Sequence, residues 1–495
     1  MKSEKGSKMR KILVGMIALL ASTMTLWAER VSEEDAALVA NNFMNVRPSS
    51  SAAGVRTAAP GRRMVRKSTK VENESRYYVY ENADGEGWVI IAANDVVRPV
   101  LAYSETGHFN TENMPSNLRK WMVKYDHYIT RLEEDSITAG EETESQWNAL
   151  RKSPRAAVTH TPVVGPLIQT QWDQGAPYNN LCPGTGNDKA YTGCVATAMA
   201  QVMNYWQWPE KGMGKKSYRP LDPTNPYIWN WPNYSARYTD SLSADFENTT
   251  YNWSAMRKTY SSLMIGASAA KTAVATLMYH CGVATEMMYG NEDDGGSGTY
   301  TNNLQDWTWG TPDSEMSGGC AQNALWYYFR YKKSITAYMR DGYSEKIHRQ
   351  TVYIYYSWTD EDWTAMLKAE LDKKHPILYS GSSEEGGHSF ICDGYDKEGY
   401  FHFNWGWSGE ADGYFLLSAL NPGAGGAGGG SYQFSEDQDV IIGIEPDRPE
   451  EPMREDTEAL ENTEVTPQAT KQIYGDQVVI IRGNKIYDLM GRQLK

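Results

Sequence analysis

The sequence predicts an α+β protein with a small N-terminal unit, a large central unit and a short C-terminal tail. At 495 residues the chain is longer than a usual single domain. Within the central unit, runs with helical spacing come first, and short strands separated by glycines follow. Because helices precede strands instead of alternating with them, we expect a helical half packed against an antiparallel sheet.

The N-terminus has the pattern of a secretory signal peptide. Basic residues within 1–11 precede the largely apolar run 12–27, which ends at the small residue Ala28. The run is too short and too weakly flanked for a stable membrane span, and no cysteine follows it as a lipoprotein anchor would need. We therefore predict residues 1–28 to be a signal peptide and the mature chain to be exported, secreted or at the cell surface.

The next segment, residues 29–155, is predicted to be a small α+β unit. The expected elements are a helix over 31–44 capped by Ser32, strands over 77–80, 88–92 and 97–103, and a helix over 117–132. The polar segment 133–161 is predicted to be a linker, where proteolysis would be tolerated. A plain interdomain tether is the alternative interpretation.

Composition narrows the class of partner. The net charge of -14 disfavours nucleic acid as a partner. The chain has 33 Tyr and 17 Trp but only 9 Phe, a pattern typical of aromatic side chains that line surfaces and grooves.

The 5 cysteines are an odd number, so at least one thiol is free or pairs with another molecule. The other four could form two disulfides or remain buried thiols.

The central unit is organised around the segment 191–206. Apolar residues recur after Cys194 at three- and four-residue spacing, which predicts an internal helix whose first turn carries the cysteine. A helix N-terminus favours a thiolate, because unpaired backbone N–H groups and the helix dipole stabilise negative charge. A core cysteine packed beside Gly193 is the alternative. Further helices are predicted over 263–282 and 360–373, and strands over 376–379, 388–394, 399–404 and 413–417.

A histidine and an asparagine follow the cysteine. His388 comes directly after two glycines at the start of a predicted strand, a setting that suits a general base as well as an ordinary strand edge. Asn404 precedes Trp405 in a Trp-Gly-Trp motif, which could orient an imidazole, form a packing corner or bind carbohydrate. These residues give the order Cys, His, Asn.

In this order and in its motifs, the sequence resembles the streptopain family of papain-like secreted cysteine peptidases. The motifs are Trp-Asp-Gln-Gly-Ala-Pro-Tyr-Asn at 172–179, Thr-Gly-Cys-Val-Ala-Thr-Ala-Met-Ala-Gln at 192–201, Gly-Gly-His-Ser-Phe-Ile at 386–391 and Phe-Asn-Trp-Gly-Trp-Ser-Gly at 403–409. The resemblance runs from about residue 31 to 446 and implies a papain-like fold of two subdomains.

The resemblance also implies a role for each matching residue. Cys194 would be the nucleophile, and His388 would hold its thiolate and protonate the leaving amine. The remaining roles are oxyanion stabilisation by Gln174, orientation and shielding of the histidine by Asn404 and Trp405, and contact with the substrate backbone by Gly387 and Ser297. No metal or cofactor is expected, since the acidic run 291–294 lacks the spacing of a calcium loop and the glycine run 423–430 lacks a phosphate-binding setting.

The implied organisation is a propeptide at 29–155, a peptidase domain at 156–446 and a tail at 447–495, with activation by cleavage between residues 152 and 161. The tail ends in two short β-type runs, which resemble either part of a bacterial sorting signal or a simple hairpin. The predicted function is a zymogen of a cysteine endopeptidase acting on proteins, with its own propeptide as inhibitor. An amidase or acyl-transfer enzyme acting on cell-wall peptides, or a non-catalytic protein binding peptides or glycans, are the alternatives.

Overall fold

The described residues of the computed structural model form two compact units. One contains 30–112 and 120–152, and the other contains 114–119, 162–417 and 438–487, with gaps. The described residues are 30–45, 62–67, 76–112, 114, 116–152, 162–219, 238, 240–260, 267–291, 296–302, 319–340, 343–347, 350–354, 358–381, 388–417, 438–448, 469–474, 477–482 and 485–487. The predicted signal peptide and the predicted substrate-contacting Gly387 lie outside these ranges, and the domain limits stay predictions.

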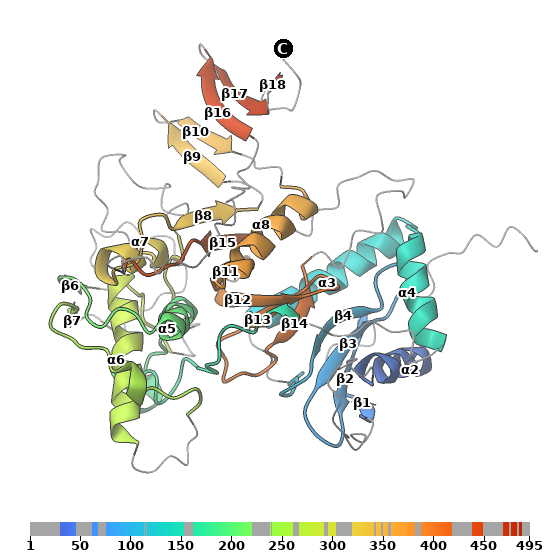
Figure 1. Cartoon of the computed structure of the whole chain (residues 1–495), viewed down its shortest axis with the longest axis horizontal. Coiled ribbons are helices and arrows are strands. Elements are labelled where there is room, and N and C mark those ends of the chain that lie inside the picture. Colours follow the sequence, from blue (N-terminus) through green and yellow to red (C-terminus); the bar gives the residue numbers. More distant parts are fainter. Residues whose placement is uncertain are drawn as a thin grey trace, which may run out of the picture. The chain divides into compact units, whose positions relative to one another are not determined.

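In the first unit, a helix packs on an antiparallel sheet (Figure 1). Ser32 caps helix α2 (Glu33–Met44), as predicted, by accepting a hydrogen bond from the Asp35 N–H. The strands lie in the order β1 (Met64–Arg66), β2 (Tyr77–Asn82), β3 (Trp88–Ala92) and β4 (Val100–Ser104). Every residue of β3 and β4 is buried. The strands predicted over 77–80 and 88–92 are confirmed, and they pair as an antiparallel hairpin.

The prediction of a linker over 133–161 is wrong for much of its length. Helix α3 (Ser116–Glu134) extends into it, and helix α4 spans Glu141–Lys152. Trp147 and Leu150, three residues apart, are buried on α4, and the Trp147 indole donates to the Val97 carbonyl at 2.8 Å. With so few apolar residues, the periodic signal was weak. Acidic residues in the first turn and basic residues in the last also favour this helix through its dipole.

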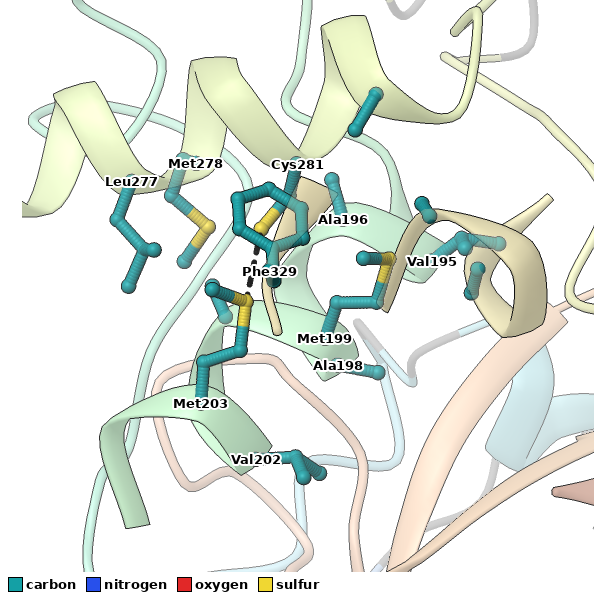
Figure 2. Close-up of a cluster of buried hydrophobic side chains, with 14 of the residues drawn as sticks. Val195, Ala196, Ala198, Met199, Val202, Met203, Leu277, Met278, Cys281 and Phe329 are labelled. Atoms are coloured by element: carbon teal, nitrogen blue, oxygen red, sulfur yellow. Dashed lines mark hydrogen bonds between the residues drawn. The ribbon is translucent and has the colours of Figure 1, made fainter. Parts of the chain in front are cut away.

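The helical half of the second unit contains α5 (Cys194–Trp206), α6 (Ser268–Ala284) and α7 (Ala321–Tyr328). Figure 2 shows the apolar stripe of α5 facing α6 and Phe329, with Cys281 Sγ 3.7 Å from Met203 Sδ. This packing confirms that α5 is internal. Helix α7 was not predicted, because its eight residues are too few for a clear periodic pattern.

The other half of the second unit is an antiparallel sheet with strand order β14-β13-β12-β11-β15-β8, and β5 also pairs with β12. Helix α8 (Asp360–Asp372) packs on β11 and β12, while α5 also contacts both strands (Figure 1). The strands are β5 (Pro162–Val164), β8 (Thr336–Met339), β11 (Ile377–Gly381), β12 (His388–Asp396), β13 (Tyr400–Asn404), β14 (Gly413–Leu416) and β15 (Gln438–Ile442). The α+β prediction is confirmed.

Shorter elements complete the described part of the second unit. They are the pairs β6 (Lys215–Tyr218) with β7 (Leu242–Asp245) and β9 (Tyr343–Ile347) with β10 (Gln350–Ile354), and the 3-10 turns η1 (Gly186–Asp188) and η3 (Trp253–Ala255). In the tail, β17 (Gln477–Arg482) pairs with β18 (Lys485–Tyr487), as the two β-type runs predicted, and β16 (Ala469–Tyr474) adds a third strand.

All five cysteines are buried and none forms a disulfide, so the four besides Cys194 are buried thiols in this structure. Burial raises the pKa of Cys182 to about 12 and also raises the pKa values of Cys281 and Cys392, which keeps these thiols neutral. Among the helices that the structure describes, none has the length and apolar character needed to cross a membrane.

Candidate active site

Cys194 is the first residue of α5, and its sulfur receives a backbone hydrogen bond from the sheet half of the unit. The side chain is buried, with 8% of its surface exposed, and the Ser389 N–H points at Sγ from 3.4 Å. Ser389 directly follows His388, so this contact brings the beginning of β12 to the cysteine. An N–H donor and a helix N-terminus both favour the thiolate form of a cysteine.

Gly193 allows the backbone conformation that places Cys194 at the start of α5. It is the N-cap of α5 and has φ +87°, a conformation that residues with a Cβ rarely adopt. A Cβ here would lie 2.7 Å from Met287 Cε and 3.2 Å from the Ser297 carbonyl oxygen. The Thr197 hydroxyl donates to the Gly193 carbonyl at 3.0 Å and so supports the same turn. Only glycine fits this position without strain.

The backbone of Gln174 is hydrogen-bonded to the segment that precedes Cys194. Its carbonyl accepts from the Thr192 N–H at 3.0 Å, two residues before Cys194. Its own N–H donates to the Asp173 carboxylate at 2.6 Å, and the other oxygen of that carboxylate accepts from the Ser408 hydroxyl at 2.8 Å. Gln174 therefore lies beside the cysteine turn, at a position fixed by three segments of the chain.

His388 opens β12, in register with Gly381 of β11, and its side chain is partly exposed. Phe390 lies two residues further along and so shares its face of the strand. The buried Trp405 ring packs on Phe390 with 4.7 Å between ring centroids, and its indole N–H donates to the Ala411 carbonyl at 3.1 Å. Trp405 is thus packed on the face of β12 to which His388 belongs.

Asn404 lies at the end of β13, where its amide binds residues other than His388. Its Oδ1 accepts from Gln201 Nε2 at 3.0 Å and from the Gly406 N–H at 3.1 Å, while its Nδ2 donates to the Thr170 carbonyl at 2.9 Å. Two accepted bonds are the usual capacity of an amide oxygen. The role of Asn404 in orienting the histidine stays a prediction.

The Ser297 hydroxyl forms hydrogen bonds with backbone groups of the protein itself. Its Oγ lies 2.7 Å from the Tyr191 carbonyl and 3.0 Å from the Gly290 carbonyl, and it accepts from the Gly290 N–H at 2.9 Å. These bonds hold residues 296–298 against the chain just before Cys194. A contact between Ser297 and a substrate would therefore use its backbone, and that contact stays a prediction.

A buried group of ionisable residues next to Trp405 was not predicted from the sequence. His402 Nδ1 is 2.6 Å from Asp393 Oδ1, and the Trp405 N–H donates to Asp412 at 2.9 Å. Burial alone would lower the pKa of His402, but the carboxylates of Asp393 and Asp412 raise it. Burial of the carboxyl group raises the pKa of Asp412 to about 7, against the lowering effect of its bond to Trp405. Only the pairing of β12 with β13 brings Asp393 to His402.

These shifts predict that the protein loses stability as the pH rises. The pKa of Asp412 rises from 3.8 when unfolded to about 7 when folded, so its protonation favours folding below pH 4 and this contribution is lost towards pH 7. The raised pKa of His402 acts in the same direction. Asp412→Asn removes this titrating carboxyl group. We therefore expect the free energy of unfolding of wild type to fall relative to that of the variant between about pH 5 and about pH 8. Urea unfolding of both proteins measures this difference, and parallel stability curves would contradict it.

Comparisons with known proteins identify relatives of this chain. Residues 172–415 match the model of the peptidase C10 family, and residues 28–129 match that of the Spi protease inhibitor. The chain is 32% identical over 387 residues to streptopain of Streptococcus pyogenes, covering 75% of this chain and 81% of that protein. It is also 32% identical over 463 residues to the thiol protease/hemagglutinin PrtT of Porphyromonas gingivalis, covering 90% of this chain but only 45% of that protein.

A solved structure shows the same relationship. The prointerpain A fragment of Prevotella intermedia aligns with a TM-score of 0.55 at 30% identity, covering 78% of this chain and all of that fragment. The likeness therefore extends across both the region that matches the inhibitor and the region that matches the peptidase. The chain belongs to the peptidase C10 family, the streptopain family of cysteine peptidases, and it carries a domain of the Spi protease inhibitor type ahead of its peptidase region.

Proposed function

We propose that this chain is the exported zymogen of a cysteine endopeptidase that hydrolyses peptide bonds in proteins. The observation that carries the proposal is the setting of Cys194, whose sulfur lies at the N-terminus of α5 and accepts the Ser389 N–H. A buried core cysteine has no need of either feature. Both features favour the thiolate, which is the reactive form in this chemistry.

In the proposed reaction, the Cys194 thiolate attacks the scissile carbonyl carbon and forms a tetrahedral oxyanion. The Cys194 N–H and the Gln174 side-chain amide donate to that oxyanion. The oxyanion collapses, the C–N bond breaks, and the His388 imidazolium gives its proton to the leaving amine. Water, deprotonated by His388, then attacks the acyl-enzyme thioester and releases the carboxylic acid and the free enzyme.

Four other residues support this chemistry in the proposal. Asn404 and Trp405 orient and shield His388, while Gly387 and the backbone of Ser297 hold the substrate chain. The packing of Trp405 on Phe390 supports its shielding role. The bonds of the Ser297 hydroxyl support a fixed backbone there.

The N-terminal region is proposed to act as the inhibitor of the same chain. Its match to the Spi protease inhibitor supports this role. Residues 1–28 would direct export, residues 29–155 would be removed after cleavage between 152 and 161, and 156–446 would form the mature peptidase. The tail at 447–495 would carry or contribute to a sorting signal.

Two other functions use parts of the same site. An amidase or acyl transferase acting on cell-wall peptides would use the same cysteine and histidine on a different substrate. A peptide- or glycan-binding protein would use the aromatic residues without the cysteine, and it would not need Gln174 held beside that cysteine. The observed tie between Gln174 and Thr192 favours the catalytic interpretation.

Casein hydrolysis tests the proposal directly. The purified full-length protein and its processed form are each incubated with casein, with and without a thiol-directed epoxide inhibitor. We expect casein cleavage and epoxide labelling of Cys194 in the processed form only, because the first domain masks the site in the precursor. N-terminal sequencing identifies the bond cleaved on activation. Processed protein that leaves casein intact would overturn the endopeptidase proposal, and equal labelling of the full-length chain would overturn the masking.

A further inference from the structure

Gln201 stands out as a buried polar side chain that the proposed mechanism does not use. It lies on α5, seven residues after Cys194, and only 1% of its surface is exposed. Seven residues are close to two helical turns, so both side chains project from the same side of α5. Burying an amide is costly unless its hydrogen bonds are made, so the bonds of Gln201 show what it holds in place.

Each bond of Gln201 joins α5 to a different part of the site. Its Oε1 accepts from the Thr170 hydroxyl at 2.9 Å and from the Trp172 N–H at 3.3 Å. Its Nε2 donates to Asn404 Oδ1 at 3.0 Å. Thr170 and Trp172 belong to the segment that continues into Gln174, and Asn404 ends β13.

Backbone groups fix the orientation of both amides. The Trp172 N–H can only donate, so the atom of Gln201 that faces it must be the oxygen. Likewise, the Gly406 N–H requires the Asn404 oxygen, and the Thr170 carbonyl requires the Asn404 nitrogen. Thr170, Gln201 and Asn404 therefore form a closed ring of hydrogen bonds. The Thr170 hydroxyl donates to Gln201, the Gln201 amide donates to Asn404, and the Asn404 amide donates to the Thr170 backbone carbonyl.

We propose that Gln201 is a positioning residue of the peptidase, which holds Gln174 and Asn404 in register with the cysteine on α5. The inference rests on the proposed function of this site. One buried amide joins the helix of the nucleophile, the segment of the oxyanion donor and the strand end of Asn404. A change at Gln201 moves these groups relative to one another without removing any of them.

Replacing the Gln201 amide by a carboxyl group distinguishes a positioning role of this side chain from a role in filling space in the core. Gln201→Glu keeps the size and both acceptor contacts, but the ionised carboxylate cannot donate to Asn404 Oδ1 and faces it with negative charge. The protonated carboxyl can donate as the glutamine does. Burial raises the pKa of such a group, so the lost bond should return as the pH falls.

The experiment compares kcat of processed Gln201→Glu and wild type on a peptide substrate at several pH values. Active-site titration with the epoxide inhibitor corrects each sample for folded sites. We expect a loss of about tenfold in kcat at about pH 8, the rate equivalent of one hydrogen bond, with little change in KM. The ratio of variant to wild-type kcat should rise towards one at about pH 5 as the carboxyl protonates.

Gln322→Glu is the matched control. Gln322 is also buried in the second unit, where its Nε2 donates to the Ile335 carbonyl at 3.2 Å. Its kcat per titrated site should follow wild type at every pH. A Gln201→Glu ratio that is flat with pH, or that matches the control, overturns the positioning role. Wild type that fails to cleave any peptide overturns the proposed function instead, so the two failures are distinguishable.

Discussion

Cys194→Ala is expected to lower casein hydrolysis by the peptidase on the order of 10⁶-fold, the size of the loss when a protease loses its nucleophile. Without the sulfur there is no atom to form the acyl-enzyme, and the remaining donors only bind the substrate. The fold should persist, because alanine fills most of the buried site at the start of α5. Activity of the variant after removal of the first domain, measured against wild type, checks the expectation.

The same variant tests self-processing. The full-length Cys194→Ala protein, purified free of other proteases, should keep its N-terminal region. Cys182→Ala is the control, since Cys182 is also buried and burial raises the pKa of its thiol to about 12. That control should process and cleave casein as wild type does. Complete processing of Cys194→Ala at the wild-type rate would remove Cys194 from the mechanism.

Gln174→Ala is expected to lower kcat by about 10²–10³-fold, the cost of one oxyanion donor in a protease. The donor acts on charge that develops only in the transition state, so KM should change little. The backbone bonds of Gln174 to Thr192 and Asp173 do not depend on its side chain, which favours a folded variant. Steady-state kinetics on a peptide substrate separate kcat from KM.

Gln171→Ala provides the comparison for this variant. Gln171 has the same side chain three residues earlier, is exposed, and donates its backbone N–H to the Lys258 carbonyl at 2.8 Å. Its kcat should stay near that of wild type. If Gln174→Ala raised KM and left kcat unchanged, Gln174 would be a substrate-binding residue and the oxyanion assignment would be wrong.

The sequence by itself determined the fold class, while the leader at residues 1–28 and the roles of the site residues stay predictions. Local patterns were sufficient for the internal helix that begins at Cys194, because its apolar residues recur over thirteen positions. They were sufficient for the β2–β3 hairpin and for α8 as well. Where only two apolar residues anchored a helix, as Trp147 and Leu150 do in α4, the local signal was too weak and the segment was predicted to be a linker.

Only the tertiary structure decided how the site residues are connected. Gln201 belongs to the motif at 192–201, but its hydrogen-bond partners lie far from it in the chain. Thr170 is 31 positions away and Asn404 is 203 positions away. The contact of Ser389 with the cysteine spans 195 positions. Such pairings follow from the packing of α5 on the sheet, and no pattern within a single helix or strand carries information about a partner so distant in the chain.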